Sequence, residues 1–336
     1  MNIQRRARYE TMRIAKPSPG LALFFLAPVV GELLSGSAPP VEFFNPIGFV
    51  MLLLLYGSGA VIVRELSVRW KKGVGTVLLL GAAYGILEEG LMVCSFFNPA
   101  WPDLGQFAVY GRWFEVNWVW AVMLTMYHAV YSITVPILLV NLAYPARRLD
   151  SWIDSRLLNA LFVILSIDVV VGLILFNSTL EYWPPPLQYL FAILAMLLLG
   201  YSAYRLPKEW GSKGRKHLPR PALMWAVGTV ATFAFFIGFW SMPALILWWS
   251  LGALLGPVLI LLFSKVLVSY DWSEPCEKHR FALLSGALTF FIVFAPLQEL
   301  DKTRTDNPVG MGLVGLAFLV GLVLLGIRVW ASSDMP

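Results

Sequence analysis

Two adjacent acidic residues and one histidine stand within stretches of sequence that are otherwise apolar. Glu88 and Glu89 follow one such stretch, and His128 lies about halfway along the next. Glu32 and Asp168 are further acids in apolar surroundings. An ionisable side chain inside a bilayer is costly unless it is paired or hydrated, so these residues are the strongest functional pointers in the chain.

Glu88, Glu89 and His128 form a set that suits hydrolysis of an amide or ester. A carboxylate acts as a general base on water, and a neutral histidine polarises a carbonyl or donates to an oxyanion. The same three residues are also a candidate metal site, but one histidine and two acids make a sparse ligand set. We therefore expect no metal and no other cofactor. Joint catalysis requires Glu88 or Glu89 to lie within about 10 Å of His128.

We expect further polar residues to share a chamber with this set. Thr125 and Tyr131 are three residues from His128, which places them on its side of an α-helix. Gly81 and Gly85 share a helix face, so a neighbouring helix can approach closely there and keep the acids away from lipid. The expected members of the polar chamber are Glu32, Tyr84, Thr125, Tyr131 and Asp168.

Two hypotheses of other classes compete with an enzyme. A transporter or proton pathway would use the buried acids along a polar path open to both sides. A membrane scaffold or assembly protein would keep them paired and dry. The chain has no His-Glu-x-x-His motif for a membrane zinc protease and no Gly-x-Ser-x-Gly nucleophile motif.

The elements that must position these residues are membrane-spanning helices. Hydrophobic residues make up 58% of the 336, charged residues 13%, and the mean hydropathy is +0.72. The apolar residues come in runs long enough to cross a bilayer as helices. We predict an all-α, polytopic bundle with ten spans, at 20–36, 46–64, 74–96, 117–143, 157–177, 186–205, 222–239, 243–265, 280–298 and 308–330.

The placement of positive charge predicts the orientation of the bundle. With ten spans, all but three of the 25 Lys and Arg residues fall on one side, and Arg112, Lys302 and Arg304 fall on the other. Such a bias marks the cytoplasmic side, so both termini are expected there. We predict a basic cytoplasmic segment 1–19, one transmembrane domain 20–330 and a cytoplasmic tail 331–336. Cys94 and Cys276 then lie on opposite sides, so no disulfide is expected.

This topology also limits the partners. Although the net charge is +5, its placement in the loops favours lipid head groups over nucleic acid. We expect a prokaryotic plasma-membrane protein whose partners are membrane lipids and a hydrophobic peptide or lipid-like substrate, while the oligomeric state is left open. The aromatic loop 95–117 is interpreted as an interfacial belt or as a lid over an apolar substrate.

Residues 86–94 resemble the first motif of the CAAX-protease and bacteriocin-processing membrane family. That motif has two glutamates and, after three intervening residues, an arginine; Glu88 and Glu89 match it, and Val93 replaces the arginine. Residues 124–128 are similar to the family's Phe-x-x-x-His motif, with Leu124 in place of phenylalanine. The resemblance covers about 50 residues, and the family's later His-x-x-x-Asn or -Asp motif is missing. It implies an intramembrane peptidase in which Glu88, Glu89 and His128 serve the reaction.

Overall fold

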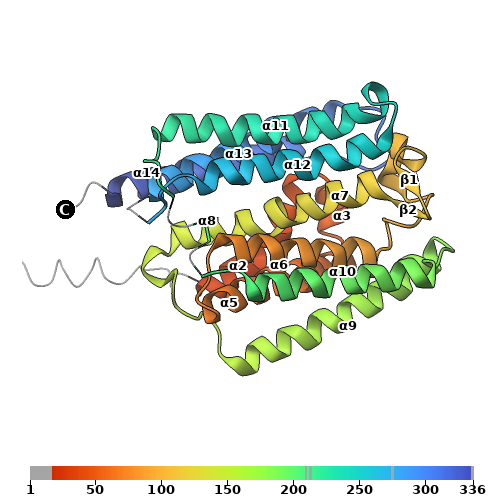
Figure 1. Ribbon diagram of the computed structural model, residues 1–336, viewed down its shortest axis with the longest axis horizontal. Helices are drawn as coiled ribbons and strands as arrows, with labels where there is room; N and C mark the ends of the chain where they lie inside the picture. Colours follow the sequence, from red (N-terminus) through yellow and green to blue (C-terminus); the bar gives the residue numbers. More distant parts are fainter. Residues whose placement is uncertain (1–16, 209, 212–213, 274–275, 334–336) are drawn as a thin grey trace, which may run out of the picture.

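The computed structural model describes residues 17–208, 210–211, 214–273 and 276–333, and in this part of the chain nearly all elements are helices that run side by side (Figure 1). Nine are long and apolar enough to cross a membrane. Their bounds are Pro46–Arg69, Val74–Met92, Trp118–Ala143, Ser155–Thr179 (α9), Pro186–Arg205 (α10), Pro221–Leu245 (α11), Trp249–Val268 (α12), Glu277–Leu300 (α13) and Met311–Ser333 (α14).

The predicted all-α polytopic bundle is therefore confirmed. The first predicted span is also helical, at Pro19–Leu34, but it is shorter than the nine others. Residues 1–16 of the predicted basic segment and 334–336 of the predicted tail lie outside the described residues. Within the described part, helix begins at Pro19 and α14 continues to Ser333.

The shorter first helix and the first three long helices are built from consecutive segments. The first comprises α2 (Pro19–Pro28) and η1 (Val29–Leu34), and the second comprises α4 (Pro46–Leu52), η2 (Leu53–Gly57) and α5 (Ser58–Arg69). The third comprises α6 (Val74–Ile86) and η3 (Leu87–Met92), and the fourth comprises α7 (Trp118–Tyr127), η5 (His128–Thr134) and α8 (Val135–Ala143). A short helix α3 (Pro40–Phe43) lies between the first two.

Several helix starts follow from local sequence. Asn45 accepts hydrogen bonds from the backbone of Ile47 and Gly48, directly before Pro46. Asn117 caps α7 and Asp154 caps α9 in the same way. Asparagine and aspartate supply the acceptor that the first free N–H groups of a helix need.

The aromatic loop 95–117 is folded rather than extended. It contains a 3₁₀ helix, η4 (Pro102–Ala108), and an antiparallel hairpin of β1 (Arg112–Trp113) and β2 (Val116–Asn117), with Arg112 opposite Asn117. Phe96, Phe97 and Phe107 are buried in it. We call the side of the bundle that carries this hairpin the hairpin face; the opposite face is the one at which α14 ends (Figure 1).

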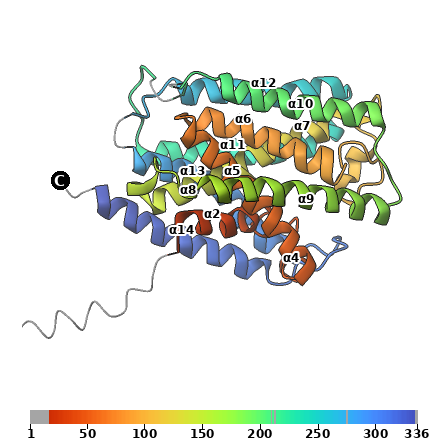
Figure 2. The same ribbon diagram turned by 90° about the horizontal axis from the view of Figure 1, so that it is seen from below.

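The later helices form a layer of their own against the first four. Figure 1 shows α11, α13 and α14 in one part of the bundle and α9 and α10 in the other, and Figure 2 shows α12 and α14 at opposite edges. Helix α13 packs against both α11 and α14. Contact between α11 and α13 is very close at two glycines: a Cβ on Gly286 would lie 2.1 Å from the Trp225 carbonyl oxygen, and one on Gly228 would lie 2.2 Å from that of Leu283. This contact sets the positions of Phe236 on α11 and Phe290 on α13, whose rings stack 4.4 Å apart.

We expect Gly286→Ala to destabilise the protein because the new methyl group meets backbone atoms that cannot move aside. Overpacking of this kind costs about 1–3 kcal/mol. The matched control is Gly200→Ala on α10, where a Cβ would meet nothing within 4 Å. Thermal midpoints of both variants in the same detergent check this expectation, and equal midpoints would contradict the close α11–α13 contact.

Candidate active site

The polar residues at the centre of the bundle all lie in π-helical segments. Glu32 is in η1, Tyr56 in η2, Glu88 and Glu89 in η3, and His128 is the first residue of η5. A π-helical turn has i→i+5 hydrogen bonds in place of the i→i+4 bonds of an α-helix, and such turns are frequent at functional sites. Four consecutive helices therefore change their geometry at the depth where their polar side chains meet.

Glycines on α6 bring the acids and the histidine together. A Cβ on Gly81 would lie 3.0 Å from the Ala129 backbone, and one on Gly85 would lie 3.0 Å from the His128 Cβ. This close approach of α6 to α7 and η5 agrees with the glycine face expected from the sequence.

His128 lies between the two adjacent glutamates. Its Nδ1 is 3.3 Å from Glu88 Oε2, and its Nε2 is 3.1 Å from Glu89 Oε1. Nδ1 also lies 3.0 Å from Ser132 Oγ. The distances from His128 to both glutamates are far below the limit of about 10 Å for joint catalysis. In the imidazolium form both ring nitrogens are donors, which matches a carboxylate on each side.

Glu32 joins this cluster through Tyr56. The Tyr56 hydroxyl makes very short contacts with both Glu32 Oε1 and Glu88 Oε1. The tyrosine can lie across η1 because Gly31 has no side chain: a Cβ there would be 2.6 Å from the Tyr56 ring. Tyr127 ties the same turn to α7 by donating to the Gly31 carbonyl at 2.6 Å.

Glu88 and Glu89 differ in the hydrogen bonds that their carboxylate oxygens accept. Glu89 Oε2 accepts from Ser95, whose hydroxyl in turn accepts from the Trp120 indole at 3.1 Å. Glu88 is only 6% exposed, and its Oε2 has no hydrogen-bond partner among the described residues. The buried Tyr84 hydroxyl lies near Glu88 but makes no aligned hydrogen bond there. Glu88 Oε2 can therefore accept a further hydrogen bond.

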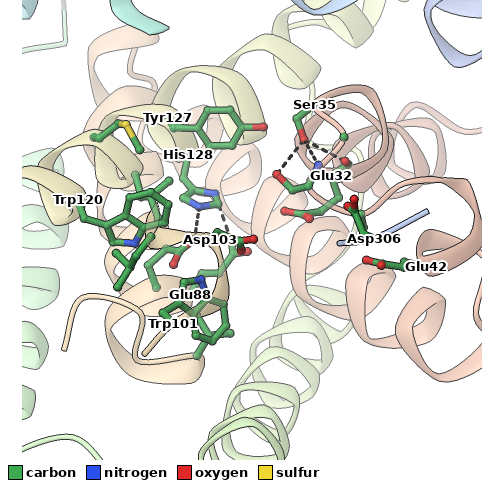
Figure 3. A pocket seen from close by; sticks show the side chains of 18 of the residues that line it. Glu32, Ser35, Glu42, Glu88, Trp101, Asp103, Trp120, Tyr127, His128 and Asp306 are labelled. Atoms are coloured by element: carbon green, nitrogen blue, oxygen red, sulfur yellow. Dashed lines mark hydrogen bonds and ion pairs between the residues drawn. The ribbon is translucent and has the colours of Figure 1, made fainter. Parts of the chain in front are cut away.

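The cluster forms the inner end of a cavity of about 790 Å³ (Figure 3). Glu32, Glu88, Glu89 and His128 line this end. One wall is aromatic and comes from α11 and α13, including Phe236, Trp240, Phe290, Phe291 and Phe294. Residues from the loops of the hairpin face line the rest, among them Ser37, Glu42, Trp101, Asp103, Arg304 and Asp306.

The mouth of the cavity is acidic. Arg304 is bound to Asp306 and also donates to Gln298 Oε1 at 2.7 Å and to the Gly36 carbonyl at 2.8 Å. Glu42 and Asp103, both solvent-exposed, have no ion pair among the described residues. Partial desolvation raises the pKa of Asp103, and the charge of Glu89 raises it further. Desolvation likewise raises the pKa of Glu42, with a contribution from Asp306.

The structure separates the other residues expected in the polar chamber. Tyr84 lies beside the cluster, whereas Thr125 packs against Gly85, and neither lines the cavity. Tyr131 points to α11 and donates to Thr232 at 3.0 Å. Asp168 is buried on α9 and does not line the cavity, and its Oδ2 has no hydrogen-bond partner in the described part of the chain.

Sequence reasoning missed Tyr56 and the mouth residues. A tyrosine within the apolar run 50–56 was a signal for Tyr56, since a buried hydroxyl needs a partner. Glu42, Asp103 and Asp306 come from three different loops, and no spacing in the sequence relates them.

Glu88, Glu89 and His128 are also compact enough for a metal ion, because one ligand atom from each lies within 4.8 Å of the others. The two ring nitrogens of His128 nevertheless face different carboxylates, so the three side chains satisfy one another as ion pairs.

Comparison with known proteins gives one match. Residues 21–334 match the model of a family described as an uncharacterized membrane protein family. No curated protein and no solved structure matches the chain.

We expect Tyr56→Phe to destabilise the protein, since it removes the hydroxyl that bridges Glu32 and Glu88 and with it the one proton that this hydroxyl donates between the two carboxyl groups. Loss of a buried partner costs about 1–3 kcal/mol. Tyr201→Phe on α10, where the side chain is 60% exposed, is the control. Thermal midpoints measure both; a Tyr56→Phe midpoint equal to that of the control would show that the bridge contributes nothing.

Proposed function

The chain belongs to the uncharacterized membrane protein family, and we propose that it is an intramembrane hydrolase that cleaves an amide or ester with an apolar chain. The observation that carries this proposal is the placement of His128 between Glu88 and Glu89 at the inner end of the cavity. A base, a proton donor and a space for substrate and water meet at this point.

In the proposed reaction Glu88 is the general base. Its Oε2 takes a proton from a water molecule while the water oxygen attacks the carbonyl carbon. His128, in its imidazolium form, donates to the carbonyl oxygen and then gives a proton to the leaving oxygen or nitrogen. The acyl bond breaks, an acid and an alcohol or amine are released, and the proton on Glu88 returns to His128.

Glu89 has a positioning role in this scheme. Its two oxygens are occupied by His128 and Ser95, so it holds the imidazole in place. A carboxylate hydrogen-bonded to a catalytic histidine fixes the orientation of the ring and stabilises its charged form.

The shape of the cavity favours an enzyme over the competing hypotheses. Every residue that lines it belongs to the hairpin-face half of the described helices or to their loops, as a chamber open on one side requires. A transporter needs a polar path to both faces. A dry scaffold would not keep a cavity of about 790 Å³ beside three acids.

The resemblance to the CAAX-protease and bacteriocin-processing family supports the same chemistry. Its two motifs fall on Glu88, Glu89 and His128, which are in contact in the folded chain. Val93 still stands in place of the arginine, and we therefore carry over the hydrolytic chemistry and not the family's substrates.

We expect Glu88→Gln and His128→Ala to lower the rate of hydrolysis by about 10²–10⁴-fold, the contribution of a general base or acid. The assay uses purified protein in nanodiscs with a neutral fluorogenic long-chain acyl ester and an internally quenched apolar peptide. Asp168→Asn is the matched control, since Asp168 is an equally buried acid that does not line the cavity. Its rate should stay near that of the wild type.

Two results would count against this function. One is wild-type protein that cleaves neither probe, and the other is Glu88→Gln protein that folds and retains the wild-type rate. An equal loss in Asp168→Asn would mean that buried charge in general, and not this cluster, controls the rate.

We further propose that the hairpin face lies outside the cell and that both termini are cytoplasmic. The distribution of Lys and Arg supports this orientation, because among those that the structure describes only Arg112, Lys302 and Arg304 belong to the hairpin face. The substrate would then reach the cavity from the outer side of a prokaryotic plasma membrane.

Cysteine labelling of intact cells tests the orientation. Val109, on the hairpin face, is 85% exposed, and Leu149, on the opposite face, is 79% exposed. A membrane-impermeant maleimide should modify Val109→Cys and not Leu149→Cys, while both react after lysis. Cys94 and Cys276 are buried and give little background. The reverse pattern would invert the topology.

A further inference from the structure

We propose that the cavity accepts a single-chain amphiphile with a positively charged ammonium head group. This inference rests on the proposed hydrolase function and names the class of its substrate. Three features of the cavity support it: the charge, the aromatic walls and the size of the cavity.

Acidic side chains outnumber basic ones in the cavity. The basic residues that line it are His128 and Arg304, whereas the acids are Glu32, Glu42, Glu88, Glu89, Asp103 and Asp306. Arg304 is held by Asp306 and by two further acceptors, so its charge is already compensated. Glu42 and Asp103 have no ion pair among the described residues, and both line the cavity (Figure 3). The mouth therefore attracts cations and repels anions.

A buried acceptor at the inner end points to a ligand independently of the mouth. Glu88 is 6% exposed and lines the cavity, and apart from the 3.3 Å ion pair with His128 its Oε2 has no hydrogen bond among the described residues. A carboxylate oxygen has two lone pairs, so Glu88 Oε2 can accept a further hydrogen bond from water or a substrate group that enters the cavity.

Aromatic rings line the space between the two ends. Trp101, Phe107 and Trp120 come from one side, and Phe236, Trp240 and Phe290 come from the other. Aromatic faces bind ammonium groups by cation–π attraction and also pack against hydrocarbon. An anionic or a strongly hydrated neutral head group would gain from neither the rings nor the acids.

The dimensions favour a small amphiphile over a peptide. About 790 Å³ falls within the roughly 300–1,000 Å³ of sites that enclose one small ligand. An extended peptide gains affinity mainly from main-chain hydrogen bonds to a strand edge. In the described part of the chain the hairpin strands β1 and β2 have two residues each, and none of these residues lines the cavity.

These features fix the direction in which the substrate binds. The ammonium group lies at the mouth by Glu42 and Asp103, the ester lies by Glu88 and His128, and the acyl chain follows the apolar residues Met51, Leu52 and Leu55. The leaving alcohol then carries the ammonium group. Hydrolysis adds the hydroxyl of water to the acyl carbon, breaks the bond from that carbon to the ester oxygen, and protonates the released alcohol.

Binding of three amphiphiles that share a dodecyl chain tests the proposal. Radiolabelled dodecyltrimethylammonium is bound to the full chain in nanodiscs of zwitterionic lipid, with empty nanodiscs subtracted, and dodecyl maltoside and dodecyl sulfate are the competitors. We expect dodecyltrimethylammonium to bind at least about tenfold more tightly than dodecyl sulfate and to weaken as salt is added. Equal affinity for the three would overturn the proposal, and so would displacement by a basic apolar peptide at lower concentration than by unlabelled dodecyltrimethylammonium.

Charge variants at the mouth give the second arm. The double variant Glu42→Gln, Asp103→Asn should bind the cation about 5- to 30-fold more weakly, as expected for two partly exposed charges. Glu181→Gln, an exposed acid outside the cavity, should bind like the wild type. An unchanged affinity in the double variant, or an equal loss in Glu181→Gln, would contradict the assignment of the mouth.

The two proposals can fail separately. Cation-selective binding without turnover of any ester would remove the hydrolase function and retain the cationic site. Turnover of neutral esters by a protein without cation selectivity would remove only the inference made here.

Discussion

Three carboxyl groups share one imidazole and one phenol in the middle of this bundle, and the positions of four helices follow from that sharing. A charge in a low-dielectric interior is tolerated only when it is paired and hydrogen-bonded. His128 meets Glu88 and Glu89, and Tyr56 meets Glu88 and Glu32. None of these contacts can form unless the helices approach to within the distances that their glycines permit.

The layer of later helices completes the site without contributing to its charge. Phe236, Phe290 and Phe291 close the side of the cavity that the first four helices leave open. The rings of Phe236 and Phe291 also pack on Tyr131, whose hydroxyl donates to Thr232 on α11. The aromatic wall thus excludes lipid from one side of the acids, and the glycine contact of α11 with α13 holds that wall in place.

Much of the fold and part of the site could be predicted from the sequence. The features that could not be predicted depend on contacts between distant parts of the chain. Hydropathy located the long helices, and the cost of charge in a bilayer singled out Glu88, Glu89 and His128. Tyr131 was assigned to the side of His128 by α-helical spacing, which does not hold through the π-helical segment that begins at His128. The π-helical segments depend on tertiary contacts, which a sequence pattern does not reveal. The mouth of the cavity depends on them too, because three separate loops meet there.

The stability of the acid cluster depends on hydration of the cavity. Glu88 Oε2 faces the His128 ring at 3.3 Å and has no aligned hydrogen bond among the described residues, so it can also accept one from water in the cavity. In the proposed reaction, a water molecule at this oxygen would lie where Glu88 can remove its proton, next to the His128 ring that can stabilise the developing charge. A dry core would have selected an apolar residue at this position. Under the proposed hydrolase function, this incompletely bonded oxygen is a cost in stability that keeps a water molecule beside the base.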